Sequence, residues 1–314
     1  MERYQVPGVA IAVVDADGPV HTAAYGHTDE SKSRRIQDTT VFEGASLGKP
    51  LFAYAILHYR ADRPFDPSRP VAEYLRSPIV SAPEGATIIG RHFLSHSSGL
   101  AFSEAEGRRY LAFSPGSQWQ YSGLGFAVLQ QAVEELWSVS LQELVYQAVT
   151  GPLEMASTSY LPPQQGSETL ASGHDRQGNQ LPPTAWPSSS AASSLHTNAR
   201  DYGRFLSAML AALLSGGDSR AARMVEAQVE VDDALHLSWG LGWAVAQEAS
   251  DTVFLHWGSN PGYKSLVLGS LQQELGLVVL TNGDNGLEIA TALVPIVFGH
   301  KYSFLDFYML HPDD

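Results

Sequence analysis

The sequence predicts an α/β (α+β) fold in which an antiparallel sheet, built from both chain termini and flanked by helices, is joined to an inserted, mostly helical domain. Two observations carry this prediction. Strand-like apolar runs occur near the start of the chain and throughout its last third, and the segments between them have helical character. With 314 residues and 44% hydrophobic content, the chain can bury a large core. We expect residues 1–60 and 196–314 to form the sheet-plus-helix domain, and residues 61–195 to form the helical domain.

Each element has a local justification. Gly18 permits the positive φ of a tight turn between the first two strands, and Gly99 ends a later helix. Pro50 suits the first turn of a helix that continues with apolar residues. The predicted elements, in order, are strands at 9–14 and 20–25, a helix from near Ser46 to Leu57, a helical turn at 71–75, helices at 87–99, 124–136 and 141–149, an irregular loop at 161–195, a helix capped by Thr197 or Asn198 that runs to Leu214, strands within 237–245, 252–258, 264–269 and 275–281, a helix at 287–297, and an aromatic tail (Tyr302, Phe304, Phe307, Tyr308) that packs on the domain or forms a contact surface.

Composition narrows the functional classes. The formal net charge of −14 disfavours nucleic acid as a partner, because its phosphates would be repelled. The chain has no cysteine, which excludes disulfides and thiolate-bound zinc. No run approaches the roughly 20 apolar residues that span a bilayer. The N-terminus lacks the features of a signal peptide, so we expect a cytoplasmic protein as the chain stands, unless a leader has been trimmed. The oligomeric state is not indicated.

Ser46 and Lys49 are the candidate catalytic pair. They are three residues apart, so at the start of a helix their side chains lie on one face and can meet. Serine alone is a poor nucleophile and needs a neighbour that accepts its proton. A lysine held at the start of a buried helix is partly desolvated, which lowers its pKa from about 10.4 towards neutrality and makes it a usable base.

The same serine fits a second pattern. Gly44-x-Ser46-x-Gly48 matches the nucleophile elbow of α/β-hydrolases, in which an Asp and a His further along the chain supply the base. That fold needs several strands before the elbow, whereas one hairpin fits ahead of residue 44. Replacing Lys49 with alanine separates the two mechanisms, since only the first requires the lysine.

Two histidines and a tyrosine, each considered alone, are expected to have structural roles. His92 and His96 are four residues apart on a predicted helix, but no Glu follows the first and no third ligand is evident, so we expect structural histidines and no metal site. Tyr121 taken alone predicts a partly buried aromatic residue at a helix start.

Taken together, four ordered motifs resemble one family, the serine β-lactamase and penicillin-binding-protein-like hydrolases, particularly the branch of class C β-lactamases, related esterases and D-peptidases. Ser46-Leu47-Gly48-Lys49 resembles its Ser-x-x-Lys helix start, and His96-Ser97-Ser98-Gly99-Leu100 its H-x-S-G-L segment. Tyr121-Ser122 resembles the start of its Tyr-Ser-Asn motif, and His256-Trp257-Gly258 its Lys-Thr-Gly or His-x-Gly strand. The resemblance implies a β-lactamase/transpeptidase-like fold with the active site between the sheet and the helical domain.

The resemblance also implies roles for individual residues. Ser46 would be the nucleophile, with Lys49, Tyr121 and His256 completing the catalytic set. The backbone N–H groups of Ser46 and Ser259 would form the oxyanion hole, each donor being worth about 3 kcal/mol. A charge on Lys49 would lower the pKa of Tyr121, so that either group could accept the Ser46 proton. The residues implied in substrate binding are Ser122, Gly123, Trp257 and Gly258; no metal and no cofactor are implied.

Two departures from the family pattern affect the expected substrate. Gly123 replaces the asparagine that follows Tyr-Ser, which removes an amide that would hold a substrate carbonyl or support the lysine. His256 replaces the lysine of Lys-Thr-Gly, so the cation that anchors a β-lactam carboxylate is absent or only partly charged. Residues 188–194 also differ from the glycine pair of relatives, with no predictable consequence.

These observations predict a serine hydrolase that forms an acyl-enzyme on Ser46 and acts on a small ester, amide or β-lactam-like substrate. Esterase or small-amide hydrolase activity is favoured, and β-lactamase or D-amino-acid peptidase activity is the alternative within the family. From another class, the chain could be a penicillin-recognising or binding domain without turnover, whose signature would be a stable adduct or none.

Overall fold

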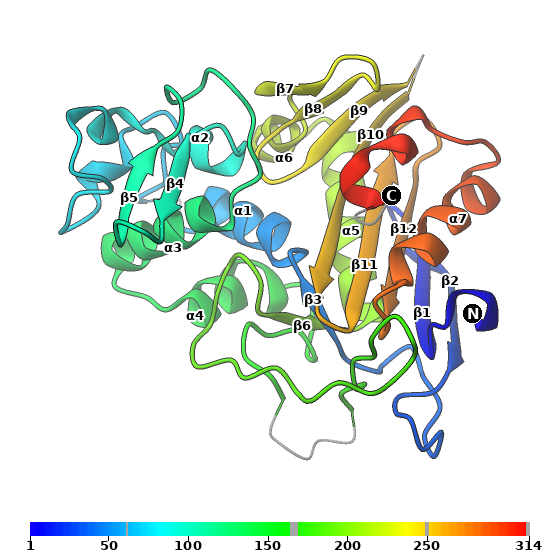
Figure 1. Cartoon of the computed structure of the whole chain (residues 1–314). Coiled ribbons are helices and arrows are strands. Elements are labelled where there is room, and N and C mark those ends of the chain that lie inside the picture. Colours follow the sequence, from blue (N-terminus) through cyan, green and yellow to red (C-terminus); the bar gives the residue numbers. More distant parts are fainter. Residues whose placement is uncertain (61, 164–168, 249–250, 312–314) are drawn as a thin grey trace.

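The computed structural model describes residues 1–60, 62–163, 169–248 and 251–311 (Figure 1). Its main feature is an eight-stranded sheet with the order β2-β1-β12-β11-β10-β9-β8-β7, in which every neighbouring pair is antiparallel. The strands are β1 (Gly8–Asp15), β2 (Gly18–Gly26), β7 (Val229–Asp232), β8 (Leu237–Trp239), β9 (Ala244–Glu248), β10 (Asp251–Asn260), β11 (Tyr263–Ser270) and β12 (Leu275–Thr281).

The N-terminal and C-terminal parts of the chain share this sheet. Strand β1 lies between β2 and β12, with Val9 opposite Thr281, so the N-terminal hairpin joins the C-terminal meander directly. The turn of the hairpin has Gly18 at φ +141°, as expected. The predicted fold class, an antiparallel sheet built from both termini and flanked by helices, is confirmed.

Helices cover both faces of the sheet. Alternate residues of each strand point to opposite sides, and apolar residues on both sides are buried against helices. On one face lie α7 (Gly286–Phe298) and the C-terminal tail, in which Phe304 and Phe307 are buried while Tyr308 is exposed. On the other face lie α5 (Ala199–Ser215) and α1 (Gly48–His58). Asn198 caps α5, since its side chain accepts a hydrogen bond of 2.7 Å from the backbone N of Asp201.

Helix α1 is buried on most sides, as predicted. Nine of its eleven residues are buried, including Lys49 and Pro50 near its start. The remaining helices are α2 (Gly90–Leu94), α3 (Gly123–Trp137), α4 (Leu141–Val145), which continues as one π-helical turn (Tyr146–Thr150), and α6 (Ser219–Met224). None of the helices in the described ranges is long and apolar enough to cross a membrane.

The helix predicted at 87–99 is wrong in extent. Helix α2 ends at Leu94, and His96 then takes a left-handed conformation with φ +56° that reverses the chain. Gly99, at φ +70°, therefore ends the turn after the helix rather than the helix itself. The spacing of apolar residues does not reveal such a reversal. The residues of the turn are buried like those of the helix, so the sequence pattern does not change where the helix ends.

Two short strand pairs lie outside the predicted elements. Strands β3 (Phe42–Ala45) and β6 (Leu195–Thr197) pair with each other, and β4 (Leu100–Ser103) pairs with β5 (Arg108–Leu111). The β3–β6 pair brings the segment before Ser46 against the end of the loop predicted at 161–195. The described residues of that loop form no helix, and apart from Leu195 their ladder contacts are isolated bridges.

Candidate functional site

Ser46 lies between strand β3 and helix α1. Ala45, just before it, has φ +50°, a left-handed conformation that costs a non-glycine residue energy and that is common where a side chain must be aimed. The turn closes with two hydrogen bonds of 3.0 Å, from Leu47 N to Gly44 O and from Lys49 N to Ser46 O. Ser46 is therefore held on a tight turn at the mouth of a buried helix.

Lys49 meets Ser46 as the spacing predicts. Its Nζ lies 2.8 Å from Ser46 Oγ and 2.6 Å from the carbonyl oxygen of Ala192. The lysine is 1% exposed, and this burial lowers its pKa to about 7. Near neutral pH a substantial fraction of Lys49 is therefore uncharged and able to accept a proton.

Ala192 is the contact that sequence reasoning missed. Its carbonyl oxygen accepts from Lys49 and lies 3.3 Å from Ser46 Oγ, so it orients both groups. Gln130 on α3 fixes this stretch by accepting a hydrogen bond from Ala191 N (2.9 Å) and donating one to Ser189 O (3.2 Å). A backbone carbonyl has no side-chain signature, and only the irregular loop bordering a site could have suggested it.

Tyr121 stands over the lysine, with its ring centroid 4.9 Å from Lys49 Nζ. Burial raises the pKa of the phenol, and contact with the Ser46 side chain offsets this only in part. The expectation that Lys49 lowers this pKa is wrong in direction, because desolvation of the buried phenol dominates and the lysine is only partly charged near neutral pH. In the resting site Tyr121 is a neutral phenol that can donate a hydrogen bond.

His256 is buried and uncharged. Its Nδ1 lies 2.8 Å from the Trp257 carbonyl oxygen, which can only accept, so Nδ1 carries the proton and Nε2 is the lone-pair nitrogen. Burial, and secondarily the nearby Lys49, lower its pKa to about 3. His256 therefore supplies no positive charge at neutral pH. The cation that the family's Lys-Thr-Gly lysine would provide at this position is thus absent.

His96 and Ser122 support Tyr121. His96 Nδ1 accepts a hydrogen bond of 3.0 Å from Ser122 N, and the two rings of His96 and Tyr121 lie with centroids 4.3 Å apart. The Ser122 hydroxyl caps α3 by accepting from Gly125 N at 3.1 Å. His96 is thus a structural histidine, and the hydroxyl implied in substrate binding is engaged in a cap. The described part of the chain holds no group of three His, Cys, Asp or Glu side chains suited to a metal ion.

Strand β10 brings Gly258 against the nucleophile turn. A Cβ on Gly258 would lie 2.3 Å from Gly44 O, so only glycine allows this approach. Its neighbour Ser259 is exposed, and Trp257 is buried with its ring stacked on Tyr121 at 5.8 Å between centroids. Trp257 therefore packs against one side of the Tyr121 ring.

Gly123, the first residue of α3, faces Ala192. A Cβ built on it would meet Ala192 Cβ at 3.6 Å, an ordinary contact. Position 123 is therefore next to the loop that carries the Ala192 carbonyl, and it has room for a side chain. The predicted catalytic residues converge: Ser46, Lys49, Tyr121 and His256 come together from β3–α1, the start of α3 and strand β10.

Comparison with known proteins identifies the family of the chain. An uncharacterised protein of Alkalihalophilus pseudofirmus is 30% identical over 162 residues, covering 51% of this chain and 46% of its own length. Esterase EstB of Burkholderia gladioli is 29% identical over 185 residues, covering 48% of this chain and 47% of its own. The chain thus spans about half the length of these two curated relatives. The octameric penicillin-binding protein homologue from Pyrococcus abyssi shares the fold, with a TM-score of 0.82 at 18% identity over 99% of this chain and 77% of that one. The family model described as Beta-lactamase matches residues 1–295, and the chain therefore belongs to the Beta-lactamase family.

Proposed function

We propose that the protein is a serine hydrolase that forms an acyl-enzyme on Ser46 and acts on esters or small amides without a negative charge near the reacting carbonyl. One observation carries the proposal: the buried Lys49, with its pKa lowered to about 7, lies 2.8 Å from Ser46 Oγ. A base within hydrogen-bond distance and with a pKa near the working pH is what proton abstraction from serine requires.

The proposed reaction has two halves. Uncharged Lys49 takes the Ser46 proton as Oγ attacks the carbonyl carbon, and the backbone N–H groups of Ser46 and Ser259 receive the oxyanion. When the tetrahedral intermediate collapses, the leaving alkoxide takes a proton from the Lys49 ammonium, directly or through Tyr121. Water then attacks the acyl carbon as Lys49 accepts a proton from it. The bond between the acyl carbon and Ser46 Oγ breaks, Oγ takes that proton back from Lys49, and the acid is released.

The surroundings of the site favour neutral substrates. His256 is uncharged, and the buried cation on the neighbouring strand, Lys264, is bound to Asp284 with Nζ 2.5 Å from Oδ1. A substrate carboxylate would therefore lose water without gaining a partner. Gly123 offers no amide to an amide or β-lactam substrate. Esters also need less help at the leaving group, and the similarity to an esterase points the same way.

The α/β-hydrolase interpretation of Gly44-x-Ser46-x-Gly48 does not fit. Strands β1 and β2 and the short β3 precede the serine, and the sheet is antiparallel, whereas the elbow requires several earlier strands of a hydrolase sheet. Ser46 stays the proposed nucleophile, and Lys49 takes the role that the elbow assigns to a histidine.

The acyl-enzyme can be tested by intact-mass spectrometry. Wild-type protein incubated with p-nitrophenyl acetate should gain a transient acetyl group while nitrophenol release continues, and Ser46→Ala and Lys49→Ala should do neither, because nucleophile and base are then missing. Undiminished hydrolysis by Ser46→Ala would refute the proposal. A long-lived penicilloyl adduct without turnover would instead indicate a penicillin-recognising domain.

The pH dependence follows from Lys49. The value of kcat/KM for the neutral ester should rise with pH and level off above an apparent pKa of about 7, since the ammonium form cannot accept the serine proton. Burial lowers this pKa in the folded state only, so protonated Lys49 lowers the free energy of unfolding at low pH. This penalty decreases as the pH rises from about 7, the folded-state pKa, to about 10, the pKa in the unfolded chain. Melting temperatures measured at each pH separate loss of base from unfolding. A flat rate profile from about pH 5.5 to 8.5 would contradict Lys49 as the base.

Charge selectivity provides another test. Hydrolysis of p-nitrophenyl butyrate should show a kcat/KM about tenfold or more above that measured with mono-p-nitrophenyl glutarate, because His256 is uncharged and Lys264 is already paired with Asp284. The two esters share the leaving group, so the ratio reports on the acyl side alone. Equal values would contradict the proposed preference for neutral substrates.

Gly123→Asn should be tolerated, since a Cβ at this position makes only ordinary contacts. The added amide beside Lys49 and Ala192 should speed acylation by a penicillin, relative to that by p-nitrophenyl acetate, by about tenfold, the effect of one hydrogen bond to a charged group. Gly123→Ala, which adds the Cβ without the amide, is the matched control. The same gain in both variants would show that the amide is not the cause.

A further inference from the structure

Glu43 is a buried carboxyl group that the proposed reaction does not use. It lies in β3, three residues before Ser46, and is 3% exposed. Burying a charged or polar group is costly unless it is hydrogen-bonded. Its Oε2 accepts a hydrogen bond of 2.6 Å from Nδ2 of Asn260, the last residue of β10, which is 8% exposed.

Asn260 uses its amide nitrogen twice. The same Nδ2 donates to the Ser193 carbonyl oxygen at 3.1 Å. A carboxylate and a backbone carbonyl can only accept, so the orientation of the amide follows from its two partners. One side chain thus joins three segments that are far apart in the sequence: β3, the end of β10 and the loop before β6.

In each of these segments, a residue close in sequence to the contact belongs to the proposed catalytic site. Strand β3 leads directly into Ser46. Ser259, whose N–H is proposed as an oxyanion donor, immediately precedes Asn260. Ser193 immediately follows Ala192, whose carbonyl oxygen lies 2.6 Å from Lys49 Nζ and 3.3 Å from Ser46 Oγ. The Asn260 amide therefore binds the residue next to Ala192, and Asn260 itself is next to Ser259 in the chain.

The opposite strand adds to this hold on the loop. His196 on β6 lies across from Glu43, and its Nδ1 donates to the Ser194 carbonyl oxygen at 2.9 Å. Burial lowers the pKa of His196, and the negative charge of Glu43 offsets this only in part. His196 thus supports the Ser194 carbonyl oxygen and Asn260 the Ser193 one, and these are the two carbonyls that follow Ala192.

We propose that Glu43 and Asn260 are positioning residues that set the Ala192 carbonyl, and through it Lys49 and Ser46, for the acyl transfer; this inference rests on the proposed function. Neither side chain contacts the reacting atoms. Their loss should lower kcat and leave KM nearly unchanged, because misplacement of a catalytic group by about 1 Å costs on the order of 100-fold in rate.

The test uses isosteric variants of the full chain with p-nitrophenyl acetate. Asn260→Asp replaces the donor by an acceptor that faces Glu43 and Ser193 O, and kcat should fall about 100-fold with KM within about threefold. The double variant Glu43→Gln/Asn260→Asp restores a donor–acceptor pair between the two side chains but leaves Ser193 O without its donor. Its melting temperature should return towards that of the wild type, while kcat stays low. Recovery of kcat together with melting temperature would overturn the proposal, and this comparison holds even if Asn260→Asp alone does not fold.

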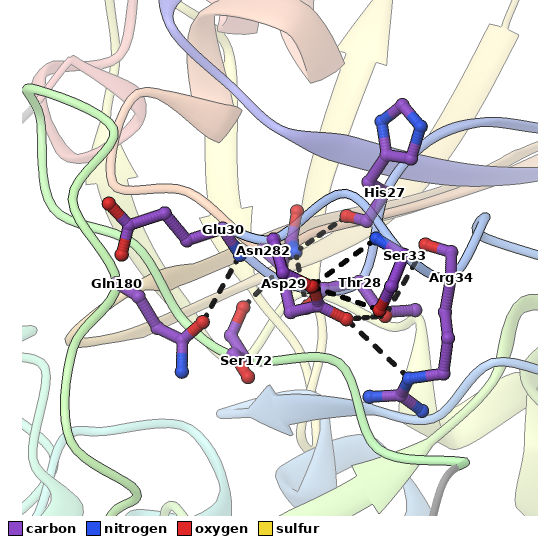
Figure 2. A network of polar contacts seen from close by, with 10 residues as sticks. His27, Thr28, Asp29, Glu30, Ser33, Arg34, Ser172, Gln180 and Asn282 are labelled. Atoms are coloured by element: carbon purple, nitrogen blue, oxygen red, sulfur yellow. Dashed lines mark hydrogen bonds and ion pairs between the residues drawn. The ribbon is translucent and has the colours of Figure 1, made fainter.

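Asn282 offers a matched control remote from the nucleophile. It is buried, and its Nδ2 donates to the backbone carbonyls of His27 (3.2 Å) and Ser172 (3.1 Å), in the polar network that also contains Asp29 (Figure 2). Asn282→Asp should lower the melting temperature while kcat stays within about twofold of the wild type. A loss of kcat as large as in Asn260→Asp would mean that any damage to the fold slows the reaction, and would overturn the proposal.

Failure of the proposed function would be recognised separately. If wild-type Ser46 is not acylated by the ester and not labelled by a fluorophosphonate, the hydrolase proposal is wrong. The positioning role is then judged from crystal structures of the wild type and Asn260→Asp. A Lys49 Nζ to Ala192 O separation that grows beyond about 3.5 Å in the variant supports it, and an unchanged contact overturns it.

Discussion

Lys49 keeps its amino group out of water and between two oxygen atoms, Ser46 Oγ and Ala192 O, and the rest of the site depends on this burial. A lysine in water would be fully protonated at neutral pH and useless as a base. Helix α1 is buried on most sides and therefore provides a dry position at its first turn. The Ala192 carbonyl compensates the lost hydration without adding a negative charge, which would raise the pKa again.

The same dry environment determines the charge of every neighbour. Burial and the proximity of Lys49 lower the pKa of His96 and His256, and burial raises that of Tyr121. All three are therefore neutral near pH 7, and the site offers hydrogen bonds and aromatic surface instead of fixed charges. The proposed proton transfer among Ser46, Lys49 and Tyr121 takes place in these surroundings, in which neither histidine carries a charge that could pair with a substrate carboxylate.

Much of the fold could be predicted because it rests on local patterns. The alternating strands, the Gly18 turn and the apolar helices α1, α3 and α5 each carry their own periodicity or cap. The pairing of β3 with β6 could not be predicted, since it joins short segments about 150 residues apart with no periodicity. The site shows the same division. The motif side chains named from the sequence lie together in the structure, whereas the Ala192 carbonyl is backbone, and the pKa direction of Tyr121 depends on burial that sequence does not reveal.

The loop before β6 supplies a piece of backbone, the Ala192 carbonyl, as a partner of the lysine. The family pattern has an asparagine where this chain has Gly123, and an amide on a helix is fixed by the helix itself. A carbonyl on an irregular loop has no such support and must be held from outside. Gln130 holds the loop before Ala192, and Asn260 with Glu43 holds it after, so its position is determined from two sides. Buried polar contacts on both sides of Ala192 therefore hold this partner of the lysine in place. In that arrangement the geometry around Lys49 depends on the packing of α3 and β10 as much as on the motif in which the lysine lies.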